Sequence, residues 1–156
     1  MTSEWQDIEP ETLLPHSGHM VWVHSVQHVE ADICETRTDT EKLHLLKQPD
    51  GRIPCWAGIE IMAQTAAVHA GMRIRKEHQS PRPGFLVSTR RYQCHVPFLP
   101  AGGRLTTRVV REFGSDVGMC ILGCTIEDTD RKTMLAEARI NVYIPSEDEP
   151  PMPTLT

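Results

Sequence analysis

The sequence predicts an α+β domain in which a curved antiparallel sheet wraps around one long helix. The first observation is that residues 57–72 are almost all small or apolar and include no Lys or Arg. A helix that is apolar on nearly every side is normally buried. The second observation is that roughly half a dozen other segments have the character of strands. With one helix and that many strands, the simplest arrangement places the helix inside the sheet.

The individual elements follow from periodicity and turn signals. The helix is predicted within residues 54–74, and the predicted strands are 20–30, 32–43, 84–96, 104–114, 117–128 and 133–144. The last strand is the clearest, because apolar residues alternate with polar ones, as expected of a strand with one buried face. Its apolar positions are Met134, Ala136, Ala138, Ile140, Val142 and Ile144. The turn signals FLPAGG, GSD and DTDRK are short, which predicts an antiparallel meander in the second half of the chain.

Length, composition and charge limit the class of protein. The 156 residues, 39% of them hydrophobic, suit a single domain, which we assign to residues 1–145. Residues 146–156 are rich in Pro and acids, so we expect a mobile tail. A net charge of −5 argues against binding to nucleic acid or to an anionic membrane. The acidic start does not resemble a secretion signal, and no apolar run is long enough to cross a membrane. We expect a cytoplasmic protein.

The cysteines and histidines do not form a convincing metal site. The five cysteines are odd in number, scattered and without a CxxC pair, so we expect buried, reduced thiols. On a strand, His24 and His28 would share a face but stand about 13 Å apart, too far to bind one ion without a bend. His16 and His19 do not improve this spacing. We therefore predict neither a bound metal nor a cofactor.

Glu60 and Gln64 are the unusual polar residues of the helix. Glu60 falls in the first turn, where the helix dipole favours a carboxylate, so it could be only a helix-start acid. Gln64 lies on the same face one turn later, inside a segment otherwise made of Ile, Met, Ala and Val. Burial and the helix terminus act on a carboxyl in opposite directions, and such competition prepares a carboxyl for acid–base work. We favour a functional role for Glu60.

A sheet wrapped around one central helix is the hot-dog arrangement. The strands at the ends of such a sheet have unpaired backbone groups, which gives them a physical reason to pair with another subunit. We therefore predict a dimer joined through sheet edges, either a homodimer or a heterodimer with a related subunit.

The order of three segments resembles the 3-hydroxyacyl-[acyl carrier protein] dehydratases of fatty-acid synthesis. The segments are LLPHSGHMVWVHSV, IPCWAGIEIMAQTAAVHAG and FLVSTRRYQCHVPFLPAGGRL, and the resemblance covers roughly residues 10–145. Family members have a Leu-Pro-His opening, a Glu-x-x-Ala-Gln helix, and an aromatic residue followed by a P-x-x-P-G turn. Within that superfamily the chain is most similar to the dehydratase-like proteins of aryl polyene gene clusters. The resemblance places Glu60 and Gln64 on the family's helix Glu and Gln.

The resemblance also implies a catalytic histidine on the loop before the helix, within a His-Phe-Pro-x-His-Pro motif. This chain departs from the motif: the region reads KLHLLKQPDGRIP, and His44 lies about two residues further from the helix. His44 is the first choice for this histidine, and His16 of the LPH opening, a position that usually supports the fold, is the second. In dehydration the histidine would be the base and Glu60 the acid. In the family, the two groups of one site come from different subunits.

The start of the helix is the predicted place for stabilising the enolate oxygen. Free backbone N–H groups there, from Cys55 to Gly58, could donate to it. The family has Gly where this chain has Cys55, which departs from the pattern. We assign substrate contacts to Cys55, Gly58, Trp56 and Gln64, with Trp56, like Trp22, either in the core or lining the substrate tunnel.

The resemblance implies a thioester substrate carried on acyl carrier protein. Because that protein is acidic, a basic patch could bind it, and the candidates are Arg73, Arg75, Lys76, Arg82, Arg90 and Arg91. The dipole at the helix end alone also explains the first three. Two alternatives to a dehydratase stay open: a thioesterase, which does not need the loop histidine, and a non-catalytic subunit that completes the site of a related partner.

Overall fold

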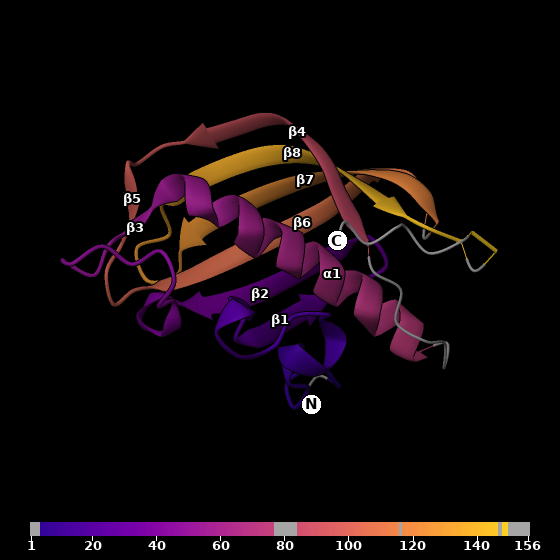
Figure 1. The fold of residues 1–156 in the computed structure, drawn as a ribbon, viewed down its shortest axis with the longest axis horizontal. Coiled ribbons are helices and arrows are strands. Elements are labelled where there is room, and N and C mark those ends of the chain that lie inside the picture. Colours follow the sequence, from indigo (N-terminus) through magenta and orange to yellow (C-terminus); the bar gives the residue numbers. More distant parts are fainter. Residues whose placement is uncertain (1–3, 77–83, 116, 147, 150–156) are drawn as a thin grey trace, which may run out of the picture.

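The fold is a six-stranded antiparallel sheet curved around one long helix, α1 (Gly58–Lys76) (Figure 1). The computed structural model describes residues 4–76, 84–115, 117–146 and 148–149. The sheet order is β1-β2-β6-β7-β8-β4, and every neighbouring pair is antiparallel. The strands are β1 (Ser25–Val29), β2 (Ile33–Asp39), β4 (Phe85–Cys94), β6 (Arg104–Phe113), β7 (Gly118–Asp128) and β8 (Met134–Ile144). The predicted fold class is therefore confirmed.

Several predicted boundaries shift by a few residues. The predicted strand 20–30 begins only at Ser25, because a short helix, Gly18–Met20, precedes it. Strand β2 ends at Asp39, whose side chain accepts a hydrogen bond from the Glu41 N–H (3.1 Å) and caps a second short helix. A small sheet of β3 (Ile53–Pro54) and β5 (Phe98–Leu99) was not predicted. Arg82 and most of the tail 146–156 lie outside the described residues.

Two sides of α1 serve different purposes, which explains why the helix is apolar nearly all round. One side, including Ile61, Met62 and Val68, is completely buried and belongs to the core, where α1 contacts β2, β6 and β7. The other side is a row of partly exposed alanines: Ala63, Ala66, Ala67 and Ala70. That row faces a cavity, described below.

The alternation predicted for β8 is confirmed in the middle of the strand and fails at its start. Ala136, Ala138 and Ile140 are buried as expected. Met134 is instead 42% exposed, because it directly follows the exposed turn residues 130–133. Leu135, on the opposite face, is buried. No helix in the described part of the chain has both the length and the apolar character needed to cross a membrane.

We expect the protein to be a dimer or a higher assembly joined through β4. This strand lies at one end of the sheet, and Leu86 and Val87 on it are 43% and 56% exposed. An exposed apolar edge strand is a template for pairing with another chain. Light scattering coupled to size-exclusion chromatography should give at least twice the 17.6 kDa chain mass.

Val87→Lys should weaken this assembly, because a charge would be placed on the pairing edge. Gln27→Lys on β1, the strand at the opposite end of the sheet, is the matched control and should leave the mass unchanged. A monomer at micromolar concentration would contradict the predicted dimer.

Candidate active site

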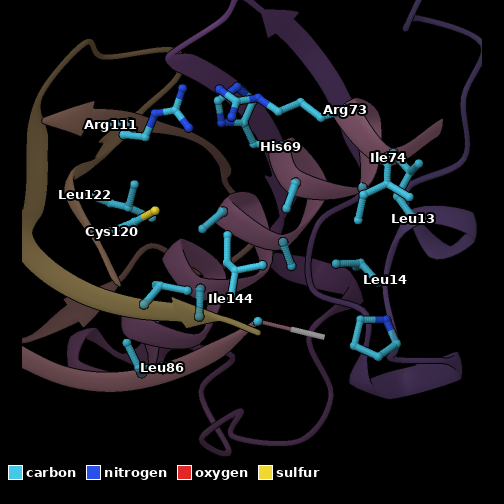
Figure 2. A pocket seen from close by; sticks show the side chains of 18 of the residues that line it. Leu13, Leu14, His69, Arg73, Ile74, Leu86, Arg111, Cys120, Leu122 and Ile144 are labelled. Atoms are coloured by element: carbon cyan, nitrogen blue, oxygen red, sulfur yellow. The ribbon is translucent and has the colours of Figure 1, made fainter. Parts of the chain in front are cut away.

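The candidate site is a cavity of about 610 Å³ beside α1. Its walls are the alanine side of α1, the N-terminal segment 12–16 and parts of β4, β6, β7 and β8 (Figure 2). Most of the lining side chains are apolar, among them Leu13, Leu14 and Leu122. A cavity of this size and polarity is typical of a site that binds a small molecule or an acyl chain.

The N-terminal segment closes tightly on the helix at Gly71. A Cβ atom built at Gly71 would lie 2.8 Å from the backbone oxygen of Leu13. Only glycine permits this approach without a shift of the backbone. The same approach brings the LPH opening alongside the first half of α1, which positions His16 in the cavity wall.

His16 and Glu60 lie against each other in the cavity wall. His16 Nε2 lies 3.3 Å from Glu60 Oε1, and the two side chains are 28% and 36% exposed. Glu60 is therefore only partly buried, and its carboxyl group lies at the wall of an accessible cavity. The second-choice histidine is the one that the structure brings to Glu60 within the chain.

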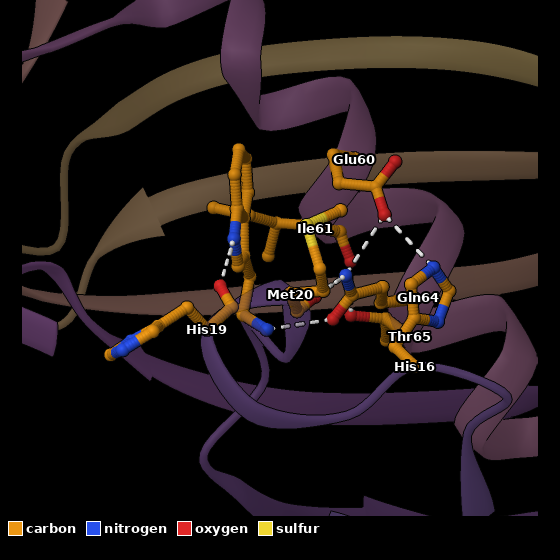
Figure 3. A network of polar contacts seen from close by, with 8 residues as sticks. His16, His19, Met20, Glu60, Ile61, Gln64 and Thr65 are labelled. Carbon is orange, nitrogen blue, oxygen red and sulfur yellow. Dashed lines mark hydrogen bonds and ion pairs between the residues drawn. The ribbon is translucent and has the colours of Figure 1, made fainter. Parts of the chain in front are cut away.

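Gln64 is a brace for Glu60 and not a wall of the cavity. It is completely buried, and its Nε2 donates to Glu60 Oε1 (2.8 Å) and to the Met20 carbonyl (2.7 Å) (Figure 3). Its Oε1 accepts the N–H of Trp22 (2.8 Å). Gln64 does not line the cavity, so its assignment to substrate contact is corrected: its contacts fix the N-terminal segment and the carboxylate.

Hydrogen bonding assigns distinct roles to the atoms of the His16–Glu60 pair. His16 Nδ1 is buried and has no hydrogen-bond partner among the described residues. A proton on Nδ1 would lack an acceptor, whereas Nε2 lies 3.3 Å from Glu60 Oε1, so Nε2 is the ring nitrogen that faces the carboxyl group. Glu60 Oε1 accepts from Gln64 Nε2 and lies 3.3 Å from His16 Nε2. Glu60 Oε2 is hydrogen-bonded to no described residue and is the oxygen able to exchange a proton with a substrate.

His44 lies elsewhere on the surface of the chain. It is exposed and makes an edge-to-face contact with His19, with 5.3 Å between ring centroids. No ion pair joins it to Glu60 within the described chain. The next two residues, Leu45 and Leu46, are 47% and 37% exposed. The His44 loop is thus an exposed, partly apolar surface available for contact with another subunit.

The N–H groups at the start of the helix are partly occupied. The N–H of Cys55 donates to the Pro97 carbonyl (3.0 Å), and the N–H of Gly58 donates to the Cys55 carbonyl. Cys55 and Gly58 are therefore not free donors for an enolate oxygen, which corrects that prediction for both residues. Gly58 is required for another reason: a Cβ there would collide with the Tyr92 hydroxyl.

Sequence reasoning did not single out Tyr92, although it noted an aromatic residue in that segment. The Tyr92 hydroxyl donates to the Cys55 carbonyl (2.6 Å) and ties β4 to the helix start. Burial, followed by the neighbouring Cys55 and Cys94, raises the pKa of Tyr92. The hydroxyl therefore keeps its proton and serves as a donor that holds the structure.

The remaining predicted residues divide between core and surface. Trp22 is in the core at 4% exposed, whereas Trp56 is 59% exposed; Trp56 neither belongs to the core nor lines the cavity. Cys94 is exposed, so the prediction of buried thiols holds for the other four cysteines only. Within the described residues, no group of three or more His, Cys, Asp or Glu side chains could hold a metal ion. Other cavity residues that sequence reasoning missed are His69 and Arg111.

A long helix enclosed by one antiparallel sheet is the architecture of the hot-dog proteins. A family model described as ApeP-like, ApeP dehydratase, matches residues 8–152. The chain therefore belongs to the ApeP-like dehydratase family, and the predicted resemblance to dehydratases is confirmed. No curated protein matches the sequence significantly.

Solved structures support the same fold. The dehydratase heterocomplex ApeI:P from Xenorhabdus doucetiae matches with a TM-score of 0.82 and 24% identity, over 90% of this chain and 93% of that one. A hypothetical thioesterase with coenzyme A from Streptococcus pneumoniae matches with a TM-score of 0.58 and 8% identity, over 77% and 84%. The PaaI protein of the E. coli phenylacetic acid operon matches with a TM-score of 0.57 and 8% identity, over 76% and 80%.

Proposed function

We propose that the protein dehydrates 3-hydroxyacyl thioesters carried on acyl carrier protein, giving trans-2-enoyl thioesters. The observation that supports this most is the Glu60 carboxylate, held by His16 and Gln64 in the wall of an apolar cavity. An acyl chain fits the apolar lining, and an oriented carboxyl provides the proton transfer that loss of water requires. Family membership and the resemblance to aryl polyene dehydratases favour this reaction over others on the same fold.

The reaction needs two groups that exchange protons with the substrate. A base removes the proton from the carbon next to the thioester carbonyl, and the resulting electron pair forms the new double bond. The bond from the next carbon to its hydroxyl breaks, and Glu60 gives that oxygen a proton from Oε2, so that water leaves. The base then releases its proton to solvent. Glu60 takes up a proton from solvent, so both groups return to their starting forms.

We assign the base to His44 of a second subunit and a positioning role to His16. His16 Nε2 faces Glu60 at 3.3 Å and Nδ1 is buried, so neither ring nitrogen is placed to take a proton from the substrate. His44 is exposed on a partly apolar loop, as a histidine that acts across a subunit interface must be. This assignment takes the second subunit to be a copy of the chain; a related hot-dog partner, of the kind present in the ApeI:P heterocomplex, would supply a histidine of its own.

The carrier protein would bind near exposed basic residues. Arg75, Lys76, Arg90 and Arg91 are exposed and remain candidates for an acidic partner. Arg73 is a weaker candidate, since it contacts the Ala31 carbonyl and the Asp32 carboxylate and lines the cavity.

The direct test incubates the purified protein with a 3-hydroxyacyl thioester on acyl carrier protein and follows the acyl group by mass spectrometry. Loss of one water from the bound acyl group supports dehydration. Release of free thiol without loss of water identifies a thioesterase instead. Activity that appears only when a related hot-dog subunit is added identifies the chain as the subunit that completes a partner's site.

Two substitutions at His16 should separate a positioning role from a base. His16→Ala should lower the melting temperature and reduce turnover less than loss of Glu60 does, because it removes a ring that contacts Glu60 but not the group that transfers the proton. His16→Gln can still donate an N–H to Glu60 and should recover most of the lost activity. Steady-state rates and thermal melts of both variants measure this; equal, complete inactivity in stable Ala and Gln variants would make His16 the base.

A further inference from the structure

Two cysteines meet where the end of β4 lies beside the start of α1 (Figure 1). Cys94, the last residue of β4, pairs with Ala136 of β8, and Ala136 is buried. Paired residues of an antiparallel ladder share a face, so the Cys94 side chain is on the inner face of the sheet, toward α1. Tyr92, two residues earlier on the same face, already reaches the helix start, because its hydroxyl donates to the Cys55 carbonyl (2.6 Å).

Contacts at the Leu135 carbonyl also bring Cys55 and Cys94 together. Cys55 Sγ lies 3.6 Å from this carbonyl oxygen, and the N–H of His95, the neighbour of Cys94, donates to it (2.9 Å). Burial, followed by interaction with the Cys94 thiol, raises the pKa of Cys55 to about 12. The two thiols are thus close enough to interact, and both are free in this structure.

The two thiols differ in their access to solvent. Cys55 is 1% exposed, whereas Cys94 is exposed. The raised pKa keeps Cys55 protonated at neutral pH, and a thiol reacts with an oxidant mainly as the thiolate. The remaining cysteines, Cys34, Cys120 and Cys124, are buried. Cys94 is therefore the cysteine that an oxidant reaches first, and Cys55 is the second thiol beside it.

We propose that Cys94 and Cys55 are a redox-sensitive pair, which peroxide converts to a disulfide between β4 and the start of α1. In the first step the Cys94 thiolate attacks one oxygen of the peroxide, the O–O bond breaks and hydroxide leaves, which gives a sulfenic acid. In the second step the Cys55 sulfur attacks the Cys94 sulfur, the S–O bond breaks, and the Cys55 proton leaves with the hydroxyl group as water. The two sulfurs together lose two electrons to the peroxide, and a dithiol reductant reverses the change.

The disulfide would join the strand at the end of the sheet to the segment that leads into Glu60, which follows Cys55 by five residues. Cys94 lies at the other end of β4 from Leu86 and Val87, and its side chain is directed to α1. Assembly through the strand edge therefore leaves the two thiols together. Closing the segment 55–94 into a loop restricts the unfolded chain, so the oxidised protein should be the more stable form.

Hydrogen peroxide applied to the folded protein, followed by intact-mass measurement and peptide mapping, tests the pair. The expected result is a chain lighter by two hydrogen atoms, a peptide that links Cys55 to Cys94, and a melting temperature raised by several degrees, all reversed by dithiothreitol. Addition of oxygen to Cys94 without a crosslink, a crosslink between two chains, or absence of reaction would overturn the proposal. These readouts need no turnover, so the result is independent of the proposed dehydration.

Variants assign the role of each thiol. Cys55→Ala keeps the exposed thiol, so peroxide should add one oxygen atom to Cys94, which dimedone traps as a sulfenic acid. Cys94→Ser should form no disulfide and keep its mass. Cys124→Ala, which removes a buried cysteine of β7, is the matched control and should form the disulfide as the wild type does. A disulfide in Cys94→Ser would contradict the pairing, and the comparison of Cys94→Ser with the wild type remains decisive if Cys55→Ala does not fold.

Discussion

Glu60→Gln should abolish dehydration while the fold and assembly remain intact. The Gln carbonyl can still accept the hydrogen bond that Oε1 receives from Gln64 and can still face His16. The group at the position of Oε2 becomes an amide, which cannot transfer a proton at neutral pH. Loss of this group should lower the rate on the order of a hundredfold or more, whereas loss of a charge near the helix start costs only about 0.3–1 kcal/mol of stability.

Single-turnover mass spectrometry of the enoyl product, together with a thermal melt, measures both effects of Glu60→Gln. Glu127→Gln on β7 is the matched control, because Glu127 does not line the cavity. The control should keep the wild-type rate. An active Glu60→Gln variant would remove Glu60 from the mechanism.

His44→Ala should lower the rate by a comparable factor, on the order of a hundredfold, and leave stability within about 0.5 kcal/mol of the wild type. The side chain is exposed, and the one ring contact it makes is with His19. Rates, melting temperatures and the mass of the assembly should be measured side by side. His28→Ala, which removes a partly exposed histidine of β1, is the control and should have no effect on the rate.

Mixing two inactive variants decides whether the site is shared between subunits. If His44 of one subunit acts with Glu60 of the other, unfolding and refolding His44→Ala together with Glu60→Gln should restore roughly a quarter of the wild-type activity, since mixed dimers contain one intact site of two. His16→Ala mixed with Glu60→Gln should add nothing to the activity that His16→Ala keeps by itself, because His16 and Glu60 meet within one chain. Full activity of His44→Ala with loss in His16→Ala and His16→Gln would reassign the base to His16.

The fold could be predicted because its signals are local in the sequence. The long helix and the strand alternation arise from residues a few positions apart, whose faces are set by the periods of 3.6 and 2. The same geometry predicted that Gln64 lies one turn from Glu60, and the structure places a hydrogen bond there. The deviations fall at strand ends, such as Met134, where a turn removes the cover that periodicity assumes.

The partners of Glu60 depend on contacts between distant segments. His16 lies 44 residues before Glu60 and His44 only 16, yet the nearer histidine in sequence is not the one that the chain brings to the carboxylate. The close approach of Leu13 to Gly71 carries the LPH opening along α1, and no local pattern encodes that packing.

The sequence by itself determined the class of fold, the acid in the first turn of the helix and the resemblance to a dehydratase, since each depends on short-range spacing or on ordered motifs. Only the tertiary structure decided that Gln64 braces Glu60 from a buried position, that Trp56 is exposed, and that His69 on α1 shares a cavity with Arg111 on β6. Exposure and shared cavity walls result from how the helix, the sheet and the N-terminal segment close on one another, and that closure involves residues far apart in the chain.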